Sequence, residues 1–373
     1  MVNLKSGGNK LKICIVTPTL SGGGAQKVAV NLANEWAEKG FEVELLVLRN
    51  TGVYFDQVSN KVCMSVLGIK RIRFALLPLW LHLTKAKPDL VLSVIRDTNL
   101  YIGILSKLFP AIRFFGREAN TMDGVLKKKA MGKYFYLNMM RYSYKNIEGI
   151  IANSSFTYQD LLDHGIKPNN SCICGNPVID KKASKLIMED VDDDWLRSEA
   201  YKVVISIGRL SKQKNHKILI KAFANVYSQN NEARLIIIGA GNEKNALEAQ
   251  ILKNQLDDVV KIIPFQKNIY KYLSKATVFV LPSIYEGFGN VIVEALFCGV
   301  EVVVTNCPGG AVEIIKNGEL GTIVENNNID SLAIGIESVL KNRKVNRGAV
   351  LKARANDFNV TNVANSYLEF MID

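Results

Sequence analysis

Two acidic side chains stand eight residues apart in the segment 282–294, which reads PSIYEGFGNVIVE. Glu286 lies on a glycine-rich turn after an apolar run, where its carboxylate can accept hydrogen bonds from sugar hydroxyls. The N–H groups of the same turn can bind phosphate or sugar oxygens. The residues predicted to contact such a ligand are Gly287, Phe288, Gly289 and Asn290. The chemistry of this turn therefore suits a sugar phosphate.

Glu294 falls in the first turns of the helix expected after this segment, among apolar neighbours such as Val291 and Leu296. A carboxylate without a partner is costly in such surroundings, and a ribose diol is a suitable partner. A structural glutamate, paired with a lysine or a backbone amide, is the competing interpretation. We favour the ribose contact.

A basic loop, residues 208–215 with the sequence GRLSKQKN, directly follows the apolar run 202–207. In open α/β sheets, ligands bind beyond the carboxyl ends of the strands. Arg209 and Lys214 can converge there on one diphosphate, Arg209 through its planar fork and Lys214 as a point charge. A solvated basic loop without a ligand is equally compatible with these residues.

A glycine-rich turn near the start of the chain, residues 17–25 with the sequence TPTLSGGGA, follows the first expected strand and opens a helix. Consecutive glycines let the backbone approach a phosphate, and the N-terminus of the helix offers unpaired N–H donors. The turn matches neither the dinucleotide-binding fingerprint nor a Walker loop. A tight turn without a ligand and a diphosphate contact therefore both remain open.

The elements that position these motifs are short apolar runs alternating with helical patterns, which indicates parallel sheets covered on both faces. The expected strands are 11–17, 41–48, 90–95, 112–116 and 149–153, then 202–207, 235–239, 259–263, 278–281 and 302–305. A chain of 373 residues is too long for one ordinary α/β core, so we expect two domains. Residues 178–201 are expected to connect them as a solvated linker. A metal site at 192–194 is the weaker interpretation of its acidic run.

The chain resembles the retaining glycosyltransferases of family four, whose motifs occur in the same order as the glycine-rich turn, the basic loop and the segment 282–294 do here. The resemblance covers nearly the whole chain, and further motifs carry it: Asn153-Ser154, Asn176-Pro177-Val178, and Cys307-Pro308-Gly309-Gly310 with Glu313. It implies the α/β GT-B fold, in which two Rossmann-like domains face each other across an interdomain cleft. The acceptor-side domain is expected at 1–178 and the nucleotide-sugar domain at 179–357, with a helix at about 358–373 packing back on the first.

The resemblance also implies roles for the donor-side residues. Residues matching Arg209 and Lys214 bind the donor diphosphate in this family and stabilise its departing charge. Glu286 is expected to contact the donor sugar and Glu294 to hold the ribose, while Phe265 lies where the family's chain passes the base. Family members transfer the sugar with retention and without an obligatory metal, so we expect no metal site and no cofactor.

On the acceptor side, Gly23 and Gly24 match the first-domain loop that closes on the diphosphate and the acceptor. Many family members carry a histidine after the fourth strand of this domain, near the reacting sugar, whereas residues 115–120 read FGREAN here. Arg117 and Glu118 are therefore expected on the acceptor side as catalytic residues, with their separate roles unassigned.

The formal charge of +12 is concentrated in the first half, because residues 1–180 hold 23 Lys and Arg against 13 Asp and Glu, a net of +10. Basic residues lead into the apolar segment 74–81 or follow it: Lys70, Arg71, Arg73, Lys127, Lys128, Lys129, Lys133 and Arg141. Such a surface suits anionic lipid, although the apolar residues can equally be the core of a covering helix. We expect a cytoplasmic protein, peripheral at the inner face of the plasma membrane, that acts on a lipid-linked or saccharide acceptor.

Composition limits the remaining classes. Six scattered cysteines suit reduced thiols, and we expect neither a signal peptide nor a membrane span. The basic half lacks the interleaved aromatics of a nucleic-acid platform, so no nucleic-acid partner is expected. The expected donor is a UDP-linked hexose or N-acetylhexosamine, used in surface polysaccharide synthesis such as lipopolysaccharide or capsule. A GT-B-type sugar-nucleotide epimerase and a non-catalytic nucleotide-sugar-binding protein are the alternatives.

Overall fold

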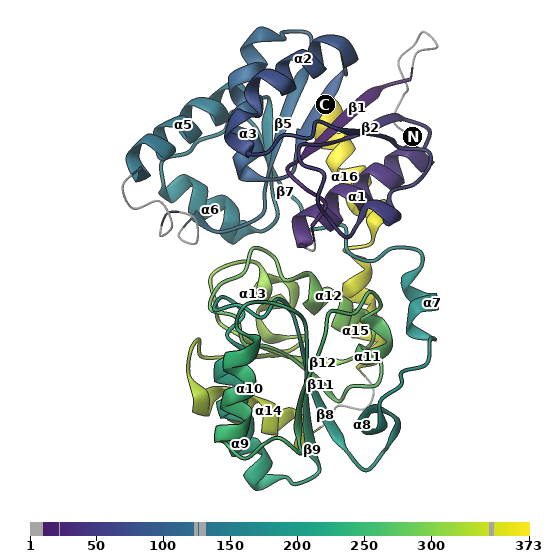
Figure 1. The fold of residues 1–373 in the computed structure, drawn as a ribbon, viewed down its shortest axis with the longest axis vertical. Coiled ribbons are helices and arrows are strands. Elements are labelled where there is room, and N and C mark those ends of the chain that lie inside the picture. The colour runs from purple at the N-terminus through teal and green to yellow at the C-terminus, as the bar shows by residue number, and fades with distance from the viewer. Residues whose placement is uncertain (1–9, 22, 123–125, 127–131, 343–346) are drawn as a thin grey trace. The chain divides into compact units, whose positions relative to one another are not determined.

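The computed structural model describes residues 10–21, 23–122, 126, 132–342 and 347–373 (Figure 1). Its contacts divide the chain into two compact domains, of which the first comprises Met1–Asp180 and Asn359–Asp373 and the second Lys181–Phe358. The sequence places the boundary after residue 178, and the structure places it after Asp180. None of the described helices is long and apolar enough to cross a membrane.

In the described residues, the first domain has a sheet of seven parallel strands in the order β3-β2-β1-β4-β5-β6-β7. The strands are β1 (Lys12–Thr17), β2 (Glu42–Val47), β3 (Cys63–Val66), β4 (Leu90–Ser93), β5 (Arg113–Glu118), β6 (Gly149–Ala152) and β7 (Ser171–Ile173). Ile13 of β1 belongs to one core cluster and Cys14 to another, because successive side chains of a strand point to opposite faces. The strand order reverses between β1 and β4, which is where open α/β sheets bind ligands.

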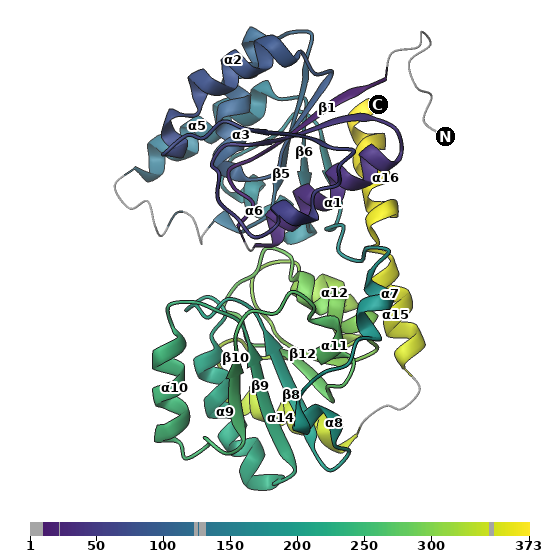
Figure 2. The same cartoon turned by 45° about the vertical axis from the view of Figure 1, so that its right-hand side comes forward.

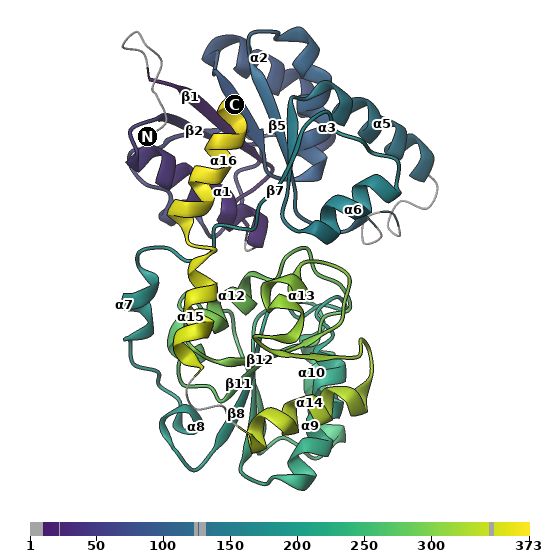
Figure 3. The same ribbon diagram turned by 180° about the vertical axis from the view of Figure 1, so that it is seen from behind.

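Helices cover both faces of this sheet (Figures 1 and 3). They are α1 (Gly24–Glu38), α2 (Leu76–Ala86), α3 (Arg96–Leu105), α5 (Lys133–Asn146), α6 (Ser155–Asp163) and α16 (Val360–Ile372), with short 3-10 helices η1 (Phe55–Gln57), η2 (Ile72–Phe74) and η3 (Ser106–Leu108). The last helix packs beside the first, and Trp36 Nε1 of α1 donates to the carbonyl oxygen of Ala364 at 3.0 Å. The end of the chain is thereby part of the first domain.

The second domain has, over its described residues, a sheet of six parallel strands in the order β10-β9-β8-β11-β12-β13 (Figure 2). The strands are β8 (Lys202–Ile207), β9 (Ala233–Ile238), β10 (Val260–Ile263), β11 (Val278–Leu281), β12 (Glu301–Thr305) and β13 (Thr322–Val324). The helices are α9 (His216–Gln229), α10 (Lys244–Lys253), α11 (Tyr270–Leu273), α12 (Asn290–Phe297), α13 (Ala311–Ile314), α14 (Ile329–Lys341) and α15 (Gly348–Asn356), with η4 (Lys316–Gly318). The order reverses between β8 and β11, as it does between β1 and β4 in the first sheet.

The acidic run of the linker is exposed at Glu189, Asp190, Asp192 and Asp194, as predicted for a solvated segment, whereas Asp193 is buried. The linker carries two short helices, α7 (Ala183–Ile187) and α8 (Asp194–Arg197). Asp193 is buried because its carboxylate caps α8 and pairs with Lys261 Nζ at 2.5 Å. The same ammonium lies 3.9 Å from the centre of the Trp195 ring. Capping and charge pairing therefore hold this part of the linker on the second domain.

Candidate active site

The two donor-side motifs of the sequence meet at one edge of the second sheet. The loop 208–215 follows β8 and the turn 282–289 follows β11, and these strands are hydrogen-bonded neighbours at the reversal of strand order. Gln213 ties the loop to the turn: its carbonyl oxygen accepts the N–H of Ile284 and its side chain donates to the carbonyl oxygen of Tyr285, both at 2.9 Å. The fold thus brings together residues about 70 positions apart in the chain.

Lys214 and Glu286 form an ion pair at this edge. Lys214 Nζ lies 2.5 Å from Glu286 Oε1, and the two side chains are only 14% and 7% exposed. The Ser283 hydroxyl donates to the same oxygen at 2.5 Å, and Thr305 Oγ1 donates to the Ser283 carbonyl oxygen at 2.6 Å. Both contacts fall on Oε1, and among the described residues none falls on Oε2. The carboxylate is therefore held in place while one oxygen stays available to a hydroxyl group.

Arg209 differs from Lys214 in its surroundings. Its side chain is exposed, and it makes no hydrogen bond or ion pair with any other residue that the structure describes. A guanidinium in this setting is free to turn towards a phosphate and to bind two of its oxygens. Of the two cations predicted to bind the diphosphate, Lys214 is thus engaged by Glu286 and Arg209 is not.

The turn around Glu286 rests on residues 307–310. The Glu286 N–H donates to the Pro308 carbonyl oxygen at 2.9 Å, and the Gly310 N–H donates to the Gly287 carbonyl oxygen at 3.1 Å. A Cβ atom on Gly309, whose φ is +125°, would lie 1.9 Å from the Glu286 carbonyl oxygen. Only a glycine allows this approach, which gives the motif a physical reason that the sequence does not reveal.

The N-terminus of α12 opens at the same turn. Gly289, with a φ of +103°, precedes the helix and has no side chain that could cap it. Glu294 lies one turn further, partly buried between buried neighbours. Burial first, and the Glu294 carboxylate second, raise the pKa of Cys298 to about 12.

Two predicted donor contacts involve aromatic residues. Phe265 follows β10 and is half exposed, as a ring that stacks on a base must be. The ring of Phe288 is buried edge-to-face against Phe358, with the ring centres 5.3 Å apart. The ring is therefore not accessible to a ligand, and a contact through the main-chain N–H of Phe288 stays a prediction.

The glycine-rich turn of the first domain lies at the reversal of its own sheet. Gly23 is the residue before α1, with extended backbone and no side-chain cap, and Gly24 is the exposed first residue of the helix. Gly22 lies outside the described residues. The open N-terminus of α1 can accept an anion.

Arg117 does not lie where it can contact an acceptor, which corrects its assignment as a catalytic residue. The side chain is fully buried on the α16 face of β5. Its guanidinium donates to the Tyr367 hydroxyl at 3.1 Å, to the Val94 carbonyl oxygen at 3.4 Å and to Asn176 Oδ1. Through these contacts the Arg117 side chain links β5 to α16 and to the segment around Asn176 that follows β7.

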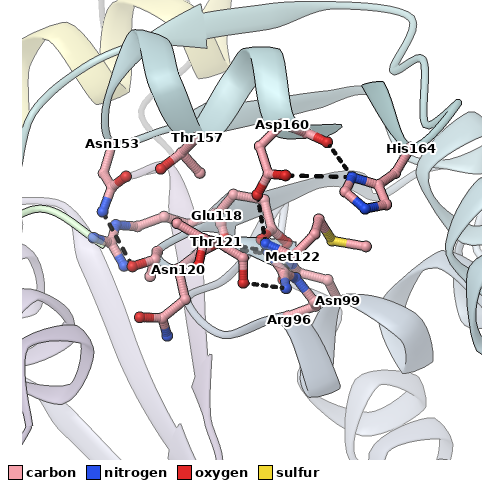
Figure 4. A network of polar contacts seen from close by, with 12 residues as sticks. Arg96, Asn99, Glu118, Asn120, Thr121, Met122, Asn153, Thr157, Asp160 and His164 are labelled. Atoms are coloured by element: carbon pink, nitrogen blue, oxygen red, sulfur yellow. Dashed lines mark hydrogen bonds and ion pairs between the residues drawn. The ribbon is translucent and has the colours of Figure 1, made fainter. Parts of the chain in front are cut away.

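Glu118 points to the opposite face of β5 and is also fully buried, so neither of the two residues predicted to be catalytic on the acceptor side is exposed in this structure. Arg96 binds its Oε2 through Nε at 2.8 Å and Nη2 at 2.5 Å (Figure 4). Asn99 Nδ2 donates to Oε1 at 3.1 Å, and the Tyr144 hydroxyl donates to the same oxygen. Burial lowers the pKa of Arg96, but the charge of Glu118 outweighs this and raises it, so the guanidinium stays charged.

Comparison with known sequences decides the family. Residues 188–356 match the family described as Glycosyl transferases group 1, and residues 22–181 match Glycosyltransferase Family 4. The chain belongs to glycosyltransferase family 4. It is a transferase with the GT-B fold of two Rossmann-like domains.

Relatives and solved structures cover nearly the whole of this family 4 glycosyltransferase. A Campylobacter jejuni protein named N-acetylgalactosamine-N,N'-diacetylbacillosaminyl-diphospho-undecaprenol 4-alpha-N-acetylgalactosaminyltransferase is 28% identical over 373 residues, 97% of this chain and 99% of that protein. A second C. jejuni protein, named GalNAc-alpha-(1->4)-GalNAc-alpha-(1->3)-diNAcBac-PP-undecaprenol alpha-1,4-N-acetyl-D-galactosaminyltransferase, is 24% identical over 384 residues, with coverage of 97% and 99%. Anabaena HepE, solved in complex with UDP and glucose, shares the fold with a TM-score of 0.78 at 19% identity, covering 96% and 98% of the two chains.

No group of three or more His, Cys, Asp or Glu side chains in the described part of the glycosyltransferase could hold a metal ion. The acidic run 192–194 therefore forms no such group, since Asp193 is engaged by α8 and Lys261. The expectation that no metal is needed for transfer stays a prediction.

We expect His216 to make the folding stability of the glycosyltransferase fall at acidic pH. Burial first, and the positive charge of Lys214 second, lower the pKa of His216 to about 3, whereas an unfolded histidine titrates near 6.5. Below about pH 6.5 the unfolded chain binds a proton that the folded chain excludes, so stability falls as the pH drops towards 3. At pH 5 the loss is about 2 kcal/mol, at about 1.4 kcal/mol per unit of pKa difference.

Urea unfolding of the chain and of a His216→Gln variant, each at pH 7 and pH 5, measures this effect. We expect the variant to lose less stability between the two pH values than the unaltered protein does. Equal losses in both proteins would show that His216 is not the group responsible.

Proposed function

We propose that this glycosyltransferase moves an N-acetylhexosamine or hexose from a UDP-linked donor, with retention, to a lipid-linked or saccharide acceptor in surface glycan synthesis. The observation that carries the proposal is the Lys214–Glu286 pair at the carboxyl edge between β8 and β11. The pair offers a cation for a diphosphate and a carboxylate for sugar hydroxyls at one point. The names of the two C. jejuni relatives, both N-acetylgalactosaminyltransferases of undecaprenol-linked saccharides, support the donor and acceptor classes.

Both names also contain an alpha linkage. When the sugar of the donor is α-linked to its diphosphate, an α-linked product requires retention at the anomeric carbon. The same stereochemistry is therefore proposed for this chain.

In the proposed reaction, the protein acts mainly through fixed charges. The donor diphosphate accepts hydrogen bonds from Arg209 and Lys214, which stabilise the negative charge that grows as the bond to the sugar breaks. Glu286 Oε2 accepts a hydrogen bond from a sugar hydroxyl while Oε1 keeps its contact with Ser283. Glu294 holds the ribose, and Phe265 stacks on the base. We propose that no metal ion takes part, since the two cations supply the positive charge.

The test is the release of UDP from UDP-N-acetylgalactosamine, with and without an undecaprenyl-diphosphate-linked saccharide ending in N-acetylgalactosamine. We expect release only with the acceptor, and an α-linked product in the NMR spectrum of the reaction. Conversion of the nucleotide sugar without an acceptor would indicate the epimerase instead. Binding of UDP without transfer to any of a panel of acceptors would favour the non-catalytic binding protein.

We also propose that the first domain rests on an anionic membrane surface. On α2, Leu79 and Leu83 are buried in the core, whereas Leu77 is 62% exposed. Further exposed apolar side chains lie beside it, together with exposed basic ones: Phe74, Trp80, Leu81, Lys70, Arg71 and Arg73. The alternative of a fully buried covering helix therefore holds for one side of α2 only. Exposed apolar residues beside cations are typical of a surface that binds anionic lipid.

The helix α5 of the same domain also has exposed apolar and basic side chains. Tyr134 and Phe135 are exposed near its start, and the predicted basic residues Lys133 and Arg141 are exposed on the same helix. The predicted basic run at 127–129 lies outside the described residues.

Flotation with liposomes tests the membrane surface. We expect binding to vesicles containing phosphatidylglycerol at low salt, and release as the salt concentration rises, because the attraction is screened within a Debye length. Leu77→Ser together with Trp80→Ser should abolish flotation. The matched control is Ile334→Ser on α14, which removes an apolar side chain that is 67% exposed in the second domain. Failure of the unaltered protein to float at low salt would end this proposal.

A further inference from the structure

The segment that follows β5 in the first domain is held by its main chain. Four residues, 119–122, leave the carboxyl end of β5 next to β4, beside the reversal of strand order. The Ala119 carbonyl oxygen accepts from Asn153 Nδ2 at 3.3 Å, and the Met122 N–H donates to Asp160. His164 Nδ1 in turn lies 3.3 Å from Asp160 Oδ1. The side chains of Asn153, in the loop after β6, and of Asp160, on α6, thus reach this short segment (Figure 4).

Arg96 provides the central contacts. Its Nη2 donates to the Asn120 carbonyl oxygen at 2.6 Å and its Nη1 to the Thr121 carbonyl oxygen at 3.4 Å. Nε and Nη2 also donate to Glu118 Oε2, which fixes the plane of the guanidinium. Because Glu118 is fully buried and bound also by Asn99 and Tyr144, the guanidinium has little freedom to turn.

This anchoring leaves one side chain exposed. Thr121 and Met122 are buried and Ala119 is partly buried, whereas Asn120 is exposed. The Asn120 amide makes no hydrogen bond with another described residue, and Figure 4 shows it turned away from the polar network. An amide offers two donors and one acceptor, which matches the hydroxyl and acetamido groups of an amino sugar.

We propose that Asn120 contacts the sugar of the acceptor, and that Arg96, held by Glu118, is the positioning residue that presents it. The inference rests on the proposed function, because it assumes that a saccharide acceptor reaches the carboxyl edge of the first sheet. It assigns a direct contact to Asn120 and an indirect role to Glu118, whose role on the acceptor side the sequence left unassigned. A preorganised contact of this kind needs a rigid support behind it, which the ion pair supplies.

The experiment is a double-mutant cycle in the transfer assay, with UDP-N-acetylgalactosamine and the undecaprenyl-diphosphate-linked saccharide as probes. Asn120→Ala should lower kcat/KM for the acceptor by roughly tenfold or more, with UDP binding and melting temperature unchanged. Arg96→Lys keeps a charge beside Glu118 but cannot reproduce the fork, so it should give a similar acceptor defect. In the double variant, the effect of Arg96→Lys should largely disappear, because the contact it positions is already gone.

The control is Glu148→Gln, which breaks the ion pair between Arg113 and Glu148, 3.1 Å long, at the amino ends of β5 and β6. We expect wild-type kinetics from it. Additive effects in the cycle would overturn the positioning role, and wild-type acceptor kinetics in Asn120→Ala would overturn the contact. If Arg96→Lys does not fold, Asn120→Ala alone still tests whether Asn120 contacts the acceptor. Glu118→Gln then takes the place of Arg96→Lys in the double-mutant cycle. Absence of transfer or UDP binding in the unaltered protein would instead count against the proposed function.

Discussion

Replacing Lys214 or Glu286 by alanine is expected to abolish acceptor-dependent UDP release, with losses of a hundredfold or more in kcat. Losing one preorganised group that stabilises transition-state charge typically costs about 3–4 kcal/mol of barrier height. Each single variant also leaves a nearly buried charge without its partner, since the side chains are 14% and 7% exposed. Such an orphaned charge destabilises a protein by about 3–5 kcal/mol. Loss of activity and loss of stability therefore have to be separated.

The double variant Lys214→Met with Glu286→Gln makes this separation. It removes both charges at once, so it should regain much of the lost melting temperature, because apolar and neutral replacements of a buried pair are often neutral for stability. Its transfer activity should nevertheless stay as low as that of the single variants, since residues acting as one unit are not additive. Recovery of activity together with stability would show that the pair is structural.

A matched control lies at the other end of the same strand. Lys202 opens β8 and pairs with Glu232 at 3.5 Å, where both side chains are solvated. Lys202→Ala should change neither melting temperature nor UDP release, because exposed pairs contribute little. Full activity in both Lys214→Ala and Glu286→Ala would contradict the assignment of the donor site.

The sequence predicts the central strands of the two sheets and, of the four edge strands that the structure describes, only β10. The runs 202–207 and 278–281 are confirmed as β8 and β11 with the same bounds. The strands not predicted are β3, β7 and β13, which have three or four residues each and lie at sheet edges. A central parallel strand is apolar on both faces, whereas an edge strand shows no continuous apolar run. All four residues of β3, for example, are exposed or only partly buried.

In the candidate site, too, features with a local sequence pattern are predicted, whereas contacts between distant residues are not. Glycine-rich turns and a basic loop after strands are visible in the sequence because strand ends and turns have local signatures. The burial of Arg117 and Glu118 is not visible in the sequence. Successive side chains of β5 point to opposite faces of the sheet, and each of these two contacts residues distant in the chain. Arg96 shows why such partners escape sequence reasoning: its contacts to Glu118 and Asn120 span more than 20 positions. An arginine directly after a strand, at the start of a helix, was the available signal.

Replacing Gly309 by alanine is expected to reduce donor binding at least tenfold and transfer about a hundredfold, although residue 309 carries no reactive group. The new Cβ would lie 1.9 Å from the Glu286 carbonyl oxygen, and a main-chain atom cannot move aside as a flexible side chain can. The φ of +125° adds strain for any residue with a Cβ. The turn must therefore shift, and a displacement of about 1 Å at a reacting centre can cost a hundredfold in rate.

Isothermal titration with UDP and the transfer assay measure the two effects separately. The matched control is Gly348→Ala at the start of α15, where an added Cβ meets nothing within 4 Å, so both measurements should stay at wild-type values. If Gly309→Ala melts like the unaltered protein but binds UDP weakly, the displacement is local to the turn, because stability elsewhere is intact. Unchanged UDP affinity and unchanged transfer in that variant would mean that the Glu286 turn does not set the donor geometry. The Lys214–Glu286 pair would then lose its place as the centre of the donor site, since Glu286 is held by the main chain that this substitution must displace.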